Sequence, residues 1–157
     1  MVNLQKCVIT GCEIVSDAYK MDEDSSIGSW MVDAEYVIDD DEYGETAGEK
    51  VLNVAKTFSY TKVEYTKKEY ITYFKGYIKR VMEYLQKENP DSVAQFKKDA
   101  MAFIKKFQSV SKEDLEFWMN ESNDPTGYVI WSYWKDPETS SAPTFVYFKY
   151  GLKLYKC

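Results

Sequence analysis

The chain has 157 residues, a length typical of one domain, and its content of 45% hydrophobic and 17% aromatic residues excludes a wholly disordered protein. Its formal net charge is −6, and it contains no histidine. The absence of histidine excludes Ser-His and Cys-His nucleophilic systems and histidine-ligated metal sites, which argues against an enzyme.

The amino-terminal part of the sequence has the pattern of short strands and lacks a targeting segment. We expect strands at residues 7–9, 13–20 and 30–37, with a turn at Thr10-Gly11. The first residues lack the basic and apolar regions of a signal peptide, and no apolar stretch approaches the roughly 20 residues that cross a bilayer. These features predict a cytosolic protein with no membrane span.

The three cysteines are Cys7, Cys12 and Cys157, and a reducing cytosol would keep them as thiols. Cys7 and Cys12 are five positions apart, which is not the CxxC spacing of redox and zinc motifs. Regular strand alternation would place them on opposite faces, although a turn at Gly11 could change that arrangement. The terminal Cys157 is either an inert thiol or the link of an intermolecular disulfide, and the chain is expected to be a monomer when it is reduced.

Two acidic runs stand in the first third of the chain, at Asp22-Glu23-Asp24 and at residues 39–42. Carboxylates attract calcium, but neither run has the alternating acidic positions, central Gly and final Glu of an EF-hand. We therefore interpret both runs as solvated acidic loops, and we expect the second to belong to a mobile loop at about residues 38–50. Gly44 and Gly48 do not form a phosphate-binding loop, because no Gly-Lys-Ser/Thr follows.

Residues 51–64 have a strand-like composition, and a helical pattern follows them. Thr66-Lys67-Lys68-Glu69 fits the capping box that begins a helix. Apolar residues then recur every three or four positions as far as Leu85. Asn89 is predicted to cap a second helix with Pro90 at its first position, and apolar residues again recur at helical spacing as far as Phe107. The sequence thus predicts an antiparallel two-helix hairpin at about residues 66–108.

Strand-like segments return after residue 112, and turn signals at residues 123–127 and 136–137 separate them. Strands before and after a helical hairpin indicate an α+β fold rather than alternating βαβ units. We expect a single domain that spans residues 1–157.

Charge is divided unevenly along the chain. Residues 65–112 carry 11 of the 20 Lys and Arg residues but only 5 of the 26 Asp and Glu residues. The excess of positive charge on the hairpin therefore indicates either an ordinary solvated basic face or a surface that binds an acidic partner. Nucleic acid is not expected as that partner, because helical packing uses the aromatic side chains of the hairpin and the net charge is negative.

Four segments of the sequence resemble the translationally controlled tumour protein family, in family order and close to both ends of the chain. They are CEIVSDAYKM at residues 12–21, YTKKEYITYFKGYIKRV at 65–81, FWMNESNDPTG at 117–127 and PTFVYFKYGLKLYKC at 143–157. The first family signature, a Gly-Gly-Asn-x-Ser-Ala-Glu stretch, is missing from residues 24–50, and Asn120 stands where the second signature has Gly. The chain therefore resembles a divergent member.

The resemblance implies a twisted, tent-like β core of mixed strands from which the helical hairpin projects. The fold is similar to that of small zinc proteins that chaperone Rab GTPases, but the chain lacks their paired CxxC motifs. No zinc site and no catalytic residue are therefore expected. The family is also described as binding calcium, and Glu116 aligns near a proposed calcium position, so weakly bound calcium is the only cofactor that the resemblance implies.

The resemblance further implies a cytosolic protein of growth and translation control with several partners. These are a Ras-family small GTPase, tubulin or microtubules, and translation elongation factors. The GTPase role centres on an early glutamate that corresponds to Glu13, whose ordinary interpretation is a solvated carboxylate. Tubulin has an acidic outer surface, and the candidate contacts are the hairpin residues Lys75, Lys79, Arg80, Lys97, Lys98, Lys105 and Lys106.

Two other classes of function remain open at this point. One is a calcium-binding or stress-protective protein. The other is a non-classically secreted factor of the histamine-releasing type, which would act as a dimer linked through Cys157.

Overall fold

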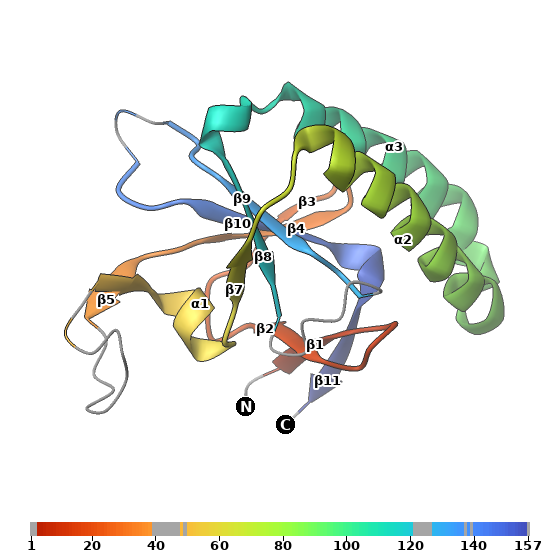
Figure 1. The fold of residues 1–157 in the computed structure, drawn as a ribbon. Coiled ribbons are helices and arrows are strands. Elements are labelled where there is room, and N and C mark those ends of the chain that lie inside the picture. The colour runs from red at the N-terminus through yellow and green to blue at the C-terminus, as the bar shows by residue number, and fades with distance from the viewer. Residues whose placement is uncertain are drawn as a thin grey trace.

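The computed structural model describes residues 3–38, 48, 50–120, 127–136, 138 and 140–156. In this part of the chain a helical hairpin lies beside antiparallel sheets, as Figure 1 shows. The predicted α+β class is therefore confirmed. Among the described residues, no helix is both long and apolar enough to cross a membrane.

Six of the described strands form the main sheet, and all their pairings are antiparallel. Their order across the sheet is β3 (Asp22–Asp24), β4 (Ser29–Asp33), β10 (Thr144–Phe148), β9 (Ile130–Tyr133), β8 (Leu115–Met119) and β7 (Thr61–Val63). The central strands β9 and β10 are buried at every position, which explains why most of their residues are apolar or aromatic.

A second sheet has the order β11 (Leu152–Lys156), β1 (Asn3–Cys7) and β2 (Glu13–Ser16). It brings the two ends of the described chain side by side, since Asn3 lies opposite Lys156 (Figure 1). A separate two-stranded ribbon consists of β5 (Tyr36–Ile38) and β6 (Lys50–Leu52). The expected mobile acidic loop falls mostly between these two strands, and residues 39–47 and 49 lie outside the described part of the chain.

The helical hairpin consists of α2 (Lys67–Glu88) and α3 (Val93–Ser109), joined through the short 3₁₀ turn η1 (Pro90–Ser92). Thr66 caps α2 as predicted: its hydroxyl accepts a 3.0 Å hydrogen bond from the Glu69 backbone N–H, and the Glu69 carboxylate accepts one from the Thr66 N–H. Pro90 stands at the first position of η1, where its missing N–H is not needed. The outer ends of the hairpin agree with the prediction within about one residue. The predicted start of the second helix is wrong: Asn89 makes no side-chain cap bond, and α3 begins at Val93 because η1 intervenes.

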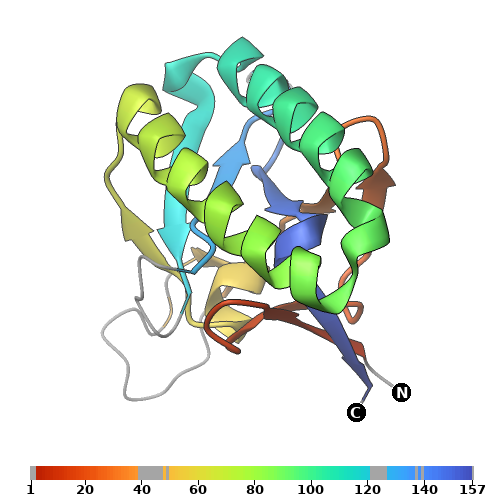
Figure 2. The same ribbon diagram turned by 90° about the vertical axis from the view of Figure 1, so that its right-hand side faces the viewer.

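Aromatic side chains join the hairpin to the main sheet. Figure 2 shows both helices lying across one side of the sheet. The Phe74 ring packs edge-on against Phe148, and the Phe103 and Phe107 rings pack against Trp131. All five of these side chains are fully or almost fully buried, so the apolar stripes of the two helices form the core with β9 and β10.

The structure departs from the predicted elements at four places. The predicted strand at 51–64 contains the helix α1 (Asn53–Thr57) between β6 and β7, because five residues are too few to display a helical period. The strand predicted at 7–9 lies earlier, at β1, and the one at 30–37 is broken between β4 and β5. The acidic run Asp22–Asp24 is strand β3 rather than a loop.

Candidate functional site

The hairpin presents a row of lysines on the side away from the sheet. Lys75 and Lys79 are four residues apart on α2, and both are exposed. The buried residues of that helix, which include Phe74, Tyr77 and Val81, occupy the opposite side. The exposed lysines Lys97, Lys98 and Lys105 of α3 likewise lie off the buried stripe of that helix. These five lysines are called the outer basic face below.

No described carboxylate forms an ion pair with a lysine of the outer basic face. Their charges are therefore not neutralised within the described structure. The net charge of −6 for the whole chain conceals this local positive surface.

Arg80 and Lys106 also belong to the predicted tubulin-contact residues, but they differ from the five lysines in their surroundings. Both are only partly exposed. The Arg80 guanidinium lies 5.9 Å from the centroid of the Tyr77 ring, and the Lys106 Nζ lies 5.2 Å from that of Tyr133. These cations contact aromatic rings of the protein itself, so the outer basic face consists of the other five candidates.

Met101 is a further residue of this surface that the sequence-based prediction missed. Its side chain is 64% exposed, the highest value among the exposed large hydrophobic side chains of the described structure. It stands four residues after Lys97 and four before Lys105, so the three side chains follow one line along α3. The spacing of four could have revealed it, because Met101 is out of phase with the buried stripe of Phe96, Phe103 and Phe107.

Glu13 lies on a different sheet from the hairpin. It is the first residue of β2, it is exposed, and it stands opposite Lys6 of β1. The next three residues, Ile14 to Ser16, are buried. The strand thus fixes the backbone at Glu13 while its carboxylate remains accessible, which is compatible with contact by a partner.

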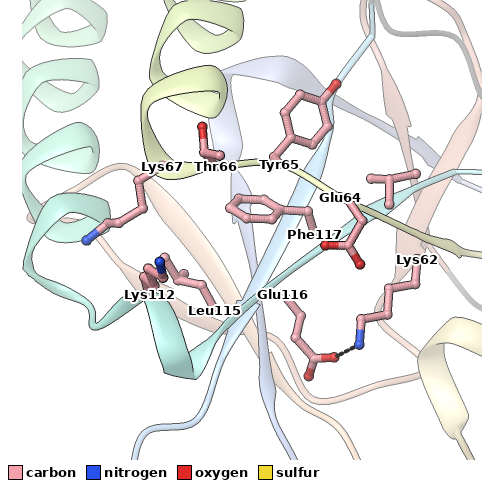
Figure 3. Close-up of a pocket in the computed structure, with 10 residues that line it drawn as sticks. Lys62, Glu64, Tyr65, Thr66, Lys67, Lys112, Leu115, Glu116 and Phe117 are labelled. Atoms are coloured by element: carbon pink, nitrogen blue, oxygen red, sulfur yellow. Dashed lines mark ion pairs between the residues drawn. The ribbon is translucent and has the colours of Figure 1, made fainter.

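Glu116, the calcium candidate, lines a cavity of about 390 Å³ between the strand pair β7–β8 and the start of α2. Figure 3 shows its carboxylate and the Lys62 ammonium pointing toward each other at the lower edge of the pocket. The hydrogen bond to Glu116 raises the pKa of Lys62, which keeps this lysine charged. Calcium takes six to eight oxygen ligands, and the described residues contain no cluster of three or more acidic or thiol groups that could hold a metal. A calcium ion at Glu116 would have to displace Lys62.

Lys67 lines the same cavity but has a structural role. Its Nζ donates hydrogen bonds to the backbone carbonyls of Gln108 and Val110, where α3 ends. A lysine at that place satisfies carbonyls that have no partner within the helix and stabilises the negative end of the helix dipole. It therefore fastens the first turn of α2 to the end of α3. Lys112, which lines the cavity from the short turn after α3, is exposed.

The remaining candidate, Cys157, lies outside the described residues. Cys7 and Cys12 are both free thiols. The predicted disulfide dimer through Cys157 therefore stays a prediction.

Comparisons with known proteins agree on one family. A family model described as "Translationally controlled tumour protein" matches residues 3–153. The translationally-controlled tumor protein homolog of Schizosaccharomyces pombe is 33% identical over 95% of this chain and 96% of its own length. The homolog of Candida albicans is 34% identical over 93% of this chain and 94% of its own length.

Solved structures give the same result. The translationally controlled tumor-associated protein p23fyp of Schizosaccharomyces pombe superimposes with a TM-score of 0.82 at 32% identity, and the match covers 100% of both chains. The translationally-controlled tumor protein of Caenorhabditis elegans has the same fold, with a TM-score of 0.72 at 18% identity. Sequence, fold and coverage together show that this chain belongs to the translationally controlled tumour protein family.

Proposed function

We propose that the chain is a non-enzymatic, cytosolic interaction protein of growth and translation control. The outer basic face would bind the acidic surface of tubulin, and the region of Glu13 would bind a Ras-family small GTPase. The two regions lie on different elements, so the two partners would contact different parts of the protein.

The observation that carries the tubulin proposal is the outer basic face itself. Its five lysines are exposed, and no described carboxylate pairs with them, so binding an acidic partner would break no internal ion pair. Met101 adds an apolar contact between Lys97 and Lys105. Such a surface suits a partner that combines carboxylates with an apolar group.

Microtubule co-sedimentation tests this proposal. The triple variant Lys79→Glu, Lys97→Glu, Lys105→Glu reverses three charges of the outer basic face, and we expect it to weaken binding by roughly tenfold or more, since exposed charge pairs contribute about 0.2 to 1 kcal/mol each. Binding of the unaltered protein should also weaken as salt is raised.

The matched control is the triple variant Lys20→Glu, Lys50→Glu, Lys87→Glu. It makes the same change in net charge at exposed positions outside the outer basic face. We expect it to bind microtubules much more tightly than the first variant. Equal loss in both variants would show that only net charge matters, and the proposal of a specific basic face would then be wrong.

The GTPase proposal depends on the exposed carboxylate that β2 holds at Glu13. A carboxylate there could compete for GTPase groups that hold magnesium or phosphate. Glu13→Val should weaken GTPase binding by roughly fivefold or more, measured by calorimetry or surface plasmon resonance, because it removes the proposed charged contact. Glu35→Val removes an exposed carboxylate elsewhere and serves as the control. Unchanged affinity in a folded Glu13→Val variant would reject this assignment.

A further inference from the structure

The hairpin of β1 and β2 brings Cys7 and Cys12 opposite each other. Lys6 of β1 pairs with Glu13 of β2, and Cys7 and Cys12 are the next residues toward the turn on each side. The Cys7 N–H donates a 2.9 Å hydrogen bond to the Cys12 carbonyl, and the Gly11 N–H donates a 2.8 Å bond to the Cys7 carbonyl. The sequence spacing left the relative placement of the two cysteines open. The turn brings them together, because the hydrogen bond from the Cys7 N–H to the Cys12 carbonyl joins their backbones directly.

The geometry of the turn explains this placement. Gly11 has a φ of +76°, a left-handed conformation that glycine adopts without strain, and it lets the chain reverse between the two cysteines. The Thr10 hydroxyl accepts a hydrogen bond from the Cys12 N–H and fixes the exit of the turn. The backbone hydrogen bond between Cys7 and Cys12 makes the two residues neighbours across the turn, which a disulfide requires because it spans Cα atoms only about 4.4 to 6.8 Å apart.

The two thiols differ in accessibility. Cys7 is 2% exposed, and Cys12 is only partly buried. An oxidant in solution can therefore reach Cys12, whereas the Cys7 thiol is buried. No heavy atom lies within 4 Å of the position that a Cβ would take at Gly11, so the turn has room to adjust. This arrangement consists of an accessible thiol with a second, protected thiol next to it.

We propose that Cys7 and Cys12 are a redox modification site that forms an intrachain disulfide on exposure to a small-molecule disulfide such as oxidised glutathione. The Cys12 thiolate attacks one sulfur of the oxidant, which forms a mixed disulfide and releases one glutathione thiolate. The Cys7 thiolate then attacks Cys12 Sγ, and the second glutathione leaves. Two protein thiols are oxidised and one oxidised glutathione is reduced to two glutathione thiols, which take up the protons that the cysteines lose.

The site is adjacent to the proposed GTPase contact but does not depend on it. Glu13 follows Cys12 directly, so the disulfide would form at the start of the strand that carries Glu13. The chemistry requires only the two cysteines and the turn between them.

Mass spectrometry of the oxidised protein tests the proposal. The background is Cys157→Ser, which removes the third thiol and its intermolecular disulfides. The protein is incubated with oxidised glutathione, quenched with acid, alkylated and digested with trypsin. Cleavage after Lys6 and Lys20 leaves both cysteines on the peptide of residues 7–20. We expect this peptide to lose two hydrogen atoms and to resist alkylation until it is reduced.

Two controls test whether the folded turn, rather than the short separation of the cysteines in the sequence, promotes the disulfide. In Cys7→Ser, no second thiol can displace glutathione, so Cys12 should accumulate as the mixed disulfide. In urea, where the turn is lost, the same redox buffer should give a smaller fraction of the internal disulfide. The proposal is overturned if the protein with both cysteines accumulates glutathione on Cys12 as Cys7→Ser does, if both thiols stay alkylatable, or if the denatured chain oxidises at least as completely as the native one.

Discussion

At the scale of single residues, the contact between Gly151 and Tyr77 shows how tightly the hairpin packs against the carboxy-terminal strands. A Cβ at Gly151 would lie 1.8 Å from the Tyr77 hydroxyl oxygen and 2.9 Å from its Cζ atom. The Tyr77 side chain is fully buried, and no described group forms a hydrogen bond with its hydroxyl. The oxygen therefore occupies space that any side chain at position 151 would need.

We expect Gly151→Ala to destabilise the protein by about 1–3 kcal/mol, because overpacking forces the neighbouring groups to shift. Urea unfolding measures the change. Tyr77→Phe removes the oxygen and should itself cost little, since a buried hydroxyl without a partner stabilises nothing. The double variant should recover part of the loss. If Gly151→Ala costs the same in the Tyr77→Phe background as in the unaltered protein, the contact does not control the packing at this position.

Side-chain pairs between distant parts of the chain could not be predicted from the sequence. Glu116 aligned with a calcium position of the family, but its ion pair with Lys62 exists only because β7 and β8 are neighbours in the sheet. Similarly, helical spacing placed Arg80 and Lys106 off the apolar stripes without showing that Tyr77 and Tyr133 lie within reach. Periodicity assigns a side of a helix, and tertiary structure decides what lies there.

At the scale of elements, the capping box at the start of α2 is a local signal that the structure reproduces. Thr66 and Glu69 exchange side-chain and backbone hydrogen bonds, and these satisfy N–H groups that the first turn leaves free. Both residues belong to one contiguous segment. A sequence motif can therefore specify the interaction without any knowledge of the rest of the fold.

Thr66→Ala should destabilise the protein by about 1 kcal/mol, since it removes the hydroxyl that caps the Glu69 N–H. Thr72→Ala is the control, because the Thr72 hydroxyl bonds only to the Lys68 carbonyl on the exposed side of the helix. Thermal unfolding of the two variants measures the difference. A Thr72→Ala variant as unstable as Thr66→Ala would mean that the loss reflects threonine removal in general rather than the cap.

The element that the sequence did not reveal is α1. Its residues Asn53 to Thr57 follow β6 directly and give no apolar stripe, and the buried side chain among them is Val54. The Asn53 side chain is instead involved in long-range backbone contacts, since its Oδ1 accepts a hydrogen bond from the Glu35 N–H. Packing against distant residues, rather than local periodicity, therefore defines this short helix.

At the scale of the whole molecule, the aromatic core is continuous between the hairpin and the main sheet. Phe103 contacts both Trp131 of β9 and Phe148 of β10, and Phe107 contacts Phe117 of β8. Separating the hairpin from the sheet would expose these rings to water. Fully burying such a side chain stabilises the fold by about 1.5–3 kcal/mol.

We therefore expect the hairpin and the sheet to unfold together. In urea, helical circular dichroism at the far-ultraviolet minimum and tryptophan fluorescence should give coincident transitions. Phe103→Leu should shift both transitions to lower urea by the same amount. A helical transition that occurs separately from the fluorescence transition would show that the hairpin is an independent unit, contrary to the predicted single domain.

The strand β3 has a consequence for how copies of this protein behave together. It forms one border of the main sheet, and its three residues are Asp22, Glu23 and Asp24. A border strand offers unpaired backbone groups to which another chain can add, and charged side chains are a common protection against that addition. Two copies that approached through β3 would bring the carboxylates of both strands together. We therefore expect this acidic run, which the sequence predicted as a solvated loop, to protect this border of the sheet from aggregation.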